Sequence, residues 1–271
     1  EAVPAGLFTL LICFVPETPR YLVSIGQDGK ALDILTRING NSKARQILND
    51  IKETITVKTE WLFTYGYLCI FVGIMLSVFQ QAVGINAVLY YAPRIFGDMG
   101  MTNPMVNTVV MGVVNILFTL VAVFTVEKLG RKPLLICGSI GMALGAFGVA
   151  LTFGHQGMEM LTMLSIMVYS ASFMFSWGPI CWVLIAEIFP NTIRGGAVAI
   201  AVAFQWIFNF IVSSTFVPMF NMHITDGDDF GHWFTYALYG LICAVAAIFV
   251  WRLVPETKGK TLEDMSKLWG K

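Results

Sequence analysis

The sequence predicts an all-α protein that spans a membrane several times, and its composition and the length of its apolar runs carry that prediction. Apolar residues make up 56% of the 271 residues and charged residues 13%, against about 45–50% and about 25% in ordinary soluble domains. A soluble fold of this length leaves too much surface in water to accommodate so many apolar side chains. The same composition excludes disordered and fibrous proteins.

Six apolar segments are long enough to cross about 30 Å of hydrocarbon, which takes roughly 20 residues. They are residues 62–91, 105–126, 133–153, 160–185, 197–218 and 233–253. We therefore expect residues 61–253 to form a six-helix transmembrane domain. Gly141 and Gly145, four residues apart in the third segment, are typical of close helix packing.

A seventh apolar run, at residues 2–15, is too short to span a bilayer. No Lys or Arg precedes it and no small-residue cleavage site follows it, so it does not resemble a signal peptide. We expect residues 1–16 to be the tail of a preceding span, with further residues upstream.

Residues 17–60 are predicted to form short amphipathic helices beneath the membrane domain. Apolar residues recur there at helical spacing in two stretches, with charges between them, and the turn signal at residues 39–41 separates the stretches. The apolar positions are Ala31, Ile34, Leu35, Ile38, Ile47, Leu48, Ile51 and Ile55. A flexible linker is the alternative, but such linkers lack this periodicity.

The distribution of positive charge predicts the orientation in the membrane. All but one of the 17 basic residues lie in four alternate segments, which include residues 17–61 and the C-terminal tail at residues 254–271. Arg94 is the only basic residue in the opposite loops. Cytoplasmic loops are enriched in Lys and Arg, so we expect a multi-pass protein of the inner (plasma) membrane, with the linker and the tail in the cytoplasm. The zero net charge argues against nucleic-acid binding.

No sequence pattern indicates an enzyme, a cofactor or a metal site. The five cysteines lie in apolar runs without a CxxC pair, where a thiol behaves as a small hydrophobe. His155, His223 and His232 fall in the expected outward loops without ligand spacing. We therefore expect no catalytic residues, no cofactor and no metal.

A four-residue string occurs at both ends of the six predicted spans. Val15-Pro16-Glu17-Thr18 follows the first apolar run, and Val254-Pro255-Glu256-Thr257 follows the last. Chance recurrence is possible in one chain, but both copies fall at a predicted cytoplasmic helix exit. Parallel six-span repeats are typical of one large transporter architecture.

Several segments resemble motifs of the sugar porter family in the major facilitator superfamily. Its cytoplasmic motifs resemble Pro16-Glu17-Thr18-Pro19-Arg20, Gly130-Arg131-Lys132, the stretch from Glu187-Ile188-Phe189-Pro190 to Arg194-Gly195, and Pro255-Glu256-Thr257-Lys258-Gly259. Its sugar-binding segments resemble residues 80–86 and 178–182. Lys132 is a departure, because many members have Arg there, but it keeps the charge.

The resemblance covers nearly the whole chain and implies the C-terminal six-helix bundle of such a transporter. It implies alternating-access transport of a monosaccharide, a pentose or hexose such as xylose, with the lipid bilayer and an N-terminal six-helix half as partners. We expect proton-coupled symport. A facilitative uniporter is the alternative, because no carboxylate lies in the middle of any of the six spans. A second alternative is a channel or receptor, in which the polar residues only form hydrogen bonds between neighbouring helices.

Polar side chains inside a span are costly, so those present mark candidate sites. Amides suit a sugar, because each offers donors and an acceptor without adding charge. Gln80, Gln81 and Asn86 cannot face one ligand on an ideal helix, so we expect a break at Gly84. Tyr90 lies one turn beyond Asn86 on the same face.

Further candidates for the sugar site lie in later spans, and for these the alternative is bonding between neighbouring helices. Gly178 leaves room beside Trp182 on one helix face, Pro179 permits a kink, and an indole can lie against a sugar ring. The remaining candidates are Asn115, Gln205 and Trp206. Asn209 is assigned to packing.

Charged residues at the span exits are candidates for a cytoplasmic gate. They are Glu17, Arg20, Glu127, Arg131, Glu187, Arg194 and Glu256. The family resemblance implies that such residues pair between the two halves when the transporter faces outward. The alternative, snorkelling of positive side chains to the interface, explains the arginines but not the glutamates.

Overall fold

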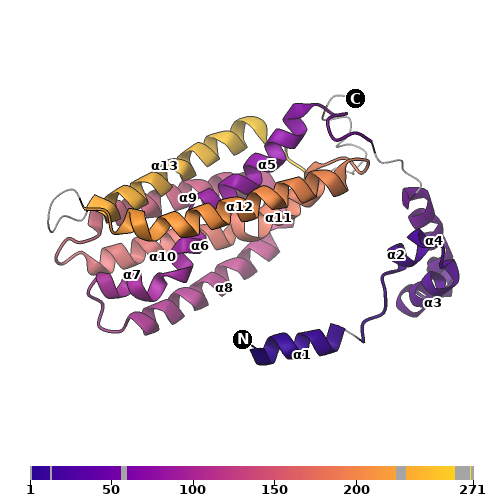
Figure 1. Ribbon diagram of the computed structural model, residues 1–271, viewed down its shortest axis with the longest axis horizontal. Coiled ribbons are helices and arrows are strands. Elements are labelled where there is room, and N and C mark those ends of the chain that lie inside the picture. The colour runs from indigo at the N-terminus through magenta and orange to yellow at the C-terminus, as the bar shows by residue number, and fades with distance from the viewer. Residues whose placement is uncertain (1, 13, 56–59, 224–229, 260–268, 270–271) are drawn as a thin grey trace. The chain divides into compact units, whose positions relative to one another are not determined.

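The computed structural model describes residues 2–12, 14–55, 60–223, 230–259 and 269, shown as a ribbon in Figure 1. Most of these residues are helical, and none of them lies in a strand. The predicted all-α fold class is therefore confirmed. The chain divides into two compact units, Glu1–Thr59 and Glu60–Lys271, and each is described by itself.

The first unit contains four helices, and its later three share a small apolar core. They are α1 (Ala2–Ile12), α2 (Pro19–Ser24), α3 (Asp28–Asn39) and α4 (Asn41–Ile55). The core holds Ala31, Leu35 and Leu48 from the predicted apolar faces. Ile38 was expected on the same face but is exposed, since it lies in the last turn of α3.

The described part of the second unit contains six helical segments long and apolar enough to span a membrane, as the sequence predicts. They are α5 (Tyr67–Ala82) with α6 (Ile85–Tyr90), α8 (Pro104–Leu129), α9 (Arg131–Thr152), α10 (Glu159–Phe175) with α11 (Trp177–Ile188), α12 (Arg194–Phe220) and α13 (Phe230–Leu253). The short helix α7 (Ala92–Asp98) follows α6. The first span starts five residues later than the predicted residue 62, because residues 62–65 form turns before Gly66. His232, expected in a loop, lies in the first turn of α13.

Helix α9 lies between α10 and α13, and its glycines allow the close approach to α10 (Figure 1). A Cβ atom on Gly145 would lie 2.6 Å from the backbone nitrogen of Tyr169. A Cβ atom on Gly141 would overlap the Ser172 side chain. The predicted packing motif at these two glycines is therefore confirmed.

Two of the six spans are interrupted. The first breaks between α5 and α6 at Gly84, whose φ of +82° is a left-handed conformation that favours glycine. This is the break that the sequence predicts. The fourth breaks at Ser176, between α10 and α11, and not at Pro179 as expected. Pro179 lies in the first turn of α11, where its missing N–H removes no helix hydrogen bond.

Candidate functional site

Five amide side chains from α5, α6 and α12 form one hydrogen-bonded network. Gln80 Oε1 accepts from Gln81 Nε2 at 2.5 Å and from Gln205 Nε2 at 2.8 Å. Gln81 Oε1 accepts from Asn86 Nδ2 at 2.7 Å and from Asn209 Nδ2 at 2.8 Å. The three glutamines are buried and the two asparagines are half-buried.

The network exists because the first span is broken at Gly84. On a continuous helix, residues five apart point about 140° away from each other, so Asn86 could not reach the Gln81 side chain. The break allows a single oxygen of Gln81 to bond both Asn86 and Asn209. The structure therefore brings together Gln80, Gln81 and Asn86, as expected, and adds Gln205.

Asn209 was assigned to bonding between neighbouring helices, and it does bond Gln81 of α5 from α12, which also makes it a member of this amide network. A local signal could have placed it there, since residues four apart on a helix share a face. Gln205 and Asn209 are such a pair on α12. Their two bonds tie α12 to the end of α5 just before the break.

The hydrogen bonds leave several groups of the network free for a ligand. Both oxygens that accept, on Gln80 and Gln81, already take two bonds each. Each side-chain NH₂ group has two donors, and every one in the network keeps at least one. Gln205 Oε1 is buried without a hydrogen-bond partner among the described residues. In the described contacts Asn86 and Asn209 bond only through their NH₂ groups, so their side-chain oxygens also stay available. The site therefore presents both N–H donors and spare amide oxygens.

Asn115 lies outside this network. Its Oδ1 accepts a hydrogen bond from Ser170 Oγ at 2.7 Å, which joins α8 to α10 in the interior. This is the contact between neighbouring helices that was the alternative for this residue. A part for Asn115 in sugar binding stays a prediction.

The predicted aromatic candidates are exposed within this chain. The exposed fractions are 44% for Trp182, 63% for Trp206 and 61% for Tyr90. Trp177 is instead fully buried, and its indole N–H donates to Ser139 Oγ at 2.7 Å. A Cβ atom on Gly178 would lie 3.4 Å from Phe173, an ordinary van der Waals contact, so a small side chain would fit there.

A second polar cluster, at the exits of the spans, centres on Arg131. Its guanidinium bonds Glu187 through Nη2 at 2.9 Å and Nε at 3.2 Å, and Glu127 through Nη2 at 2.9 Å. The Arg131 side chain is 8% exposed, that of Glu187 30% and that of Glu127 72%. Thr257, which the sequence did not single out, donates to Glu187 Oε2 at 2.6 Å.

Glu256 caps the N-terminus of α9. The backbone N–H groups of Arg131 and Lys132 each donate to its carboxylate at 3.0 Å, and that of Lys258 at 2.9 Å. Burial alone would raise the pKa of the Glu256 carboxyl, but these bonds outweigh it and hold the pKa below its usual value. A Cβ atom on Gly130 would lie 2.7 Å from the carboxylate, so a glycine is needed there.

The other gate candidates are not part of this cluster in the described contacts. The Arg194 guanidinium donates to the backbone oxygen of Phe189, at 3.2 and 3.3 Å. Glu17 and Arg20 belong to the first unit, so no contact with the cluster is assigned to them. Pairing of these residues with another half stays a prediction. Among the described residues no group of His, Cys, Asp and Glu could hold a metal.

Comparison with known proteins identifies what this chain is similar to. The family model described as "Sugar (and other) transporter" matches residues 1–269. The D-xylose-proton symporter of Escherichia coli (strain K12) is 46% identical over 99% of this chain and 56% of the relative. The glucose facilitated diffusion protein of Zymomonas mobilis is 36% identical over 97% of this chain and 56% of the relative.

Solved structures agree with the sequence comparison. The proton:xylose symporter XylE bound to 6-bromo-6-deoxy-D-glucose superposes with a TM-score of 0.82 at 46% identity, over 98% of this chain and 57% of that chain. The inward open conformation of XylE from E. coli gives a TM-score of 0.77 over 98% and 55%. The chain thus spans little more than half the length of these relatives. Since the family model covers nearly every residue, the chain belongs to the sugar transporter family of the major facilitator superfamily and is a multi-pass membrane protein.

Proposed function

We propose that this chain is the C-terminal half of a secondary transporter, not an enzyme, that carries a monosaccharide by alternating access. The observation that carries the proposal is the buried amide network at the Gly84 break. Polar groups are expensive inside a span, and a set of uncharged donors suits hydroxyl groups better than ions. The relatives named for xylose, arabinose and glucose transport support the same class of substrate.

In this proposal the network binds sugar hydroxyls through its unused N–H groups and through the spare oxygens of Gln205, Asn86 and Asn209. Trp182, Trp206 and Tyr90 are exposed within this chain, so they are available to contact the sugar or the other half. An indole face suits the apolar C–H side of a sugar ring, and its N–H suits a hydroxyl. We include Gly178, on the same helix face as Trp182, and Asn115 of α8 in the proposed sugar site.

We further propose that an N-terminal six-helix half completes the transporter. Helix α8 exposes apolar side chains along most of its length, which suits lipid or that second half. The cluster of Glu127, Arg131, Glu187 and Glu256, together with Glu17, Arg20 and Arg194, would close the cytoplasmic side when the site faces outward. We also propose that the linker and the tail lie in the cytoplasm, which the enrichment of Lys and Arg in these segments supports.

The proposal is tested by sugar uptake into proteoliposomes that contain the full-length protein. We expect D-xylose uptake to fall at least tenfold on Gln81→Ala and on Trp182→Ala. Matched controls are Asn107→Ala, an amide outside the network, and Trp251→Ala, an exposed tryptophan on α13. Uptake and binding of every monosaccharide tested at the level of empty liposomes would refute the proposal.

Proton-coupled symport is the proposed mode, because the E. coli relative at 46% identity and the Bacillus subtilis relative at 38% identity are both named as proton symporters. Facilitated diffusion is the second candidate, supported by the relative named for it. An inward proton gradient separates the two modes. A symporter accumulates D-xylose above the outside concentration, whereas a facilitator only equilibrates it.

A further inference from the structure

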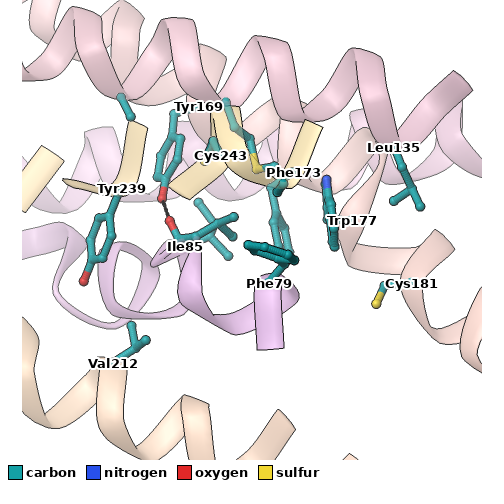
Figure 2. Close-up of a cluster of buried hydrophobic side chains, with 14 of the residues drawn as sticks. Phe79, Ile85, Leu135, Tyr169, Phe173, Trp177, Cys181, Val212, Tyr239 and Cys243 are labelled. Carbon is teal, nitrogen blue, oxygen red and sulfur yellow. Dashed lines mark hydrogen bonds between the residues drawn. The ribbon is translucent and has the colours of Figure 1, made fainter. Parts of the chain in front are cut away.

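Tyr169, on α10, reaches the break in the first span without being part of the amide network. Its hydroxyl donates a hydrogen bond to the backbone oxygen of Val83, the residue just before Gly84. Figure 2 shows its ring extending from its own helix toward the chain beside Ile85, with a dashed line marking that bond. Tyr169 and Val83 are both fully buried.

The bond satisfies a group that the break would otherwise leave unpaired. At the end of a helix the last carbonyls lose their intrahelical partners. A buried carbonyl without a partner is costly, and no water reaches Val83 to replace it. The Tyr169 hydroxyl therefore stabilises the broken form of the span over a continuous helix.

Two further contacts hold this arrangement from neighbouring helices. The Tyr239 ring, on α13, fills the space in which a Cβ atom of Gly84 would lie. The backbone of Tyr169 is in turn held against Gly145 of α9. Because the Tyr169 backbone packs closely against α9, its hydroxyl is held next to the Val83 carbonyl at the break.

The position of the break decides whether the amides can act together. Val83 lies two residues after Gln81 and three before Asn86, and these two amides bond each other across it. A change in the backbone at Val83 therefore alters the relative placement of the two groups. Tyr169 does not reach the network itself, so its effect passes through the backbone.

We infer that Tyr169 is a positioning residue of the sugar site, which its hydroxyl orders through the Val83 carbonyl. The inference rests on the proposed function and extends it to a residue that touches no sugar. Tyr169→Phe keeps the ring in the core and removes only the hydroxyl. Tyr236→Phe is the matched control, because Tyr236 is fully buried and its hydroxyl has no hydrogen-bond partner among the described residues.

The experiment measures D-xylose binding, uptake and thermal unfolding of full-length proteins that carry each change. For Tyr169→Phe we expect Kd and KM to rise about tenfold, in line with an orphaned buried acceptor. We expect the uptake rate at saturating sugar to stay within twofold. Tm should fall somewhat below that of Tyr236→Phe, because only Tyr169→Phe leaves a buried carbonyl unpaired. A role in stability alone would lower the amount of active protein and leave KM unchanged.

Three outcomes would overturn the inference. Equal Kd values for Tyr169→Phe and Tyr236→Phe would show that the hydroxyl does not order the site. Loss of folded protein for Tyr169→Phe alone would assign the residue to stability instead. Absence of monosaccharide binding by the unchanged protein would refute the proposed function, and this inference with it.

Discussion

The break at Gly84 offers the sharpest test of how this bundle builds its site, through the substitution Gly84→Ala. The φ of +82° places an alanine in a left-handed conformation, which costs about 1–2 kcal/mol. The added methyl group would also overlap the buried ring of Tyr239, and such overpacking costs about 1–3 kcal/mol. We therefore expect a loss of roughly 2–5 kcal/mol in the free energy of unfolding.

The assay compares thermal unfolding and D-xylose binding of the full-length Gly84→Ala protein with those of Gly112→Ala. Gly112 lies within α8 and has open space around it, so alanine there should stabilise by about 1 kcal/mol. The double variant Gly84→Ala/Tyr239→Leu should recover part of the loss by removing the overlap, while the backbone strain stays.

Equal stability of Gly84→Ala and Gly112→Ala would refute this reasoning. Weaker sugar binding with unchanged stability would also contradict the expected loss in the free energy of unfolding, although it would still support a role for the break in sugar binding. The two contributions are separable because the double variant changes only the steric one.

Three further predictions concern the charged cluster and the chain as a whole. Glu187→Gln should lower the free energy of unfolding by about 1.5–3 kcal/mol, since it weakens two hydrogen bonds to buried Arg131. Glu127→Gln, which changes the exposed partner, should cost under about 1 kcal/mol. Thermal unfolding of both variants measures the difference, and equal losses of stability would contradict this prediction. Because the pKa of Glu256 is lowered, its carboxylate stabilises the fold at neutral pH, and this contribution is lost as the pH falls below the usual pKa of a glutamate, about 4. Tm measured from pH 7 to pH 3 should therefore fall less in Glu256→Gln than in the unchanged protein. Parallel curves of Tm against pH would be evidence against this. The 271 residues alone should not transport D-xylose in liposomes, because they supply only one side of the proposed site, and measurable flux would disprove the proposed need for a second half.

Much of the site could be predicted from the sequence, because it depends on the chemistry of individual residues and their near neighbours in the chain. Gly84 was predicted to interrupt its helix because three amides could not otherwise converge, and glycine alone adopts the required φ without strain. Gln205 was selected because a polar amide is costly inside a span and therefore marks a candidate site. Asn209 was assigned to packing alone, and the structure shows that its bond to Gln81 of α5 also makes it part of the amide network.

The sequence by itself determined the membrane class, the six spans and their family, because apolar run length and motif order are properties of contiguous residues. Only the tertiary structure decided where the fourth span breaks, which tryptophan is buried, and that Asn115 bonds Ser170 outside the network. Those outcomes depend on atoms that other helices bring to the same place. The clearest case is the Val83 carbonyl, whose partner lies 86 residues further along the chain. No local pattern around residue 83 points to Tyr169, and only the packing of α10 against α9 places its hydroxyl there.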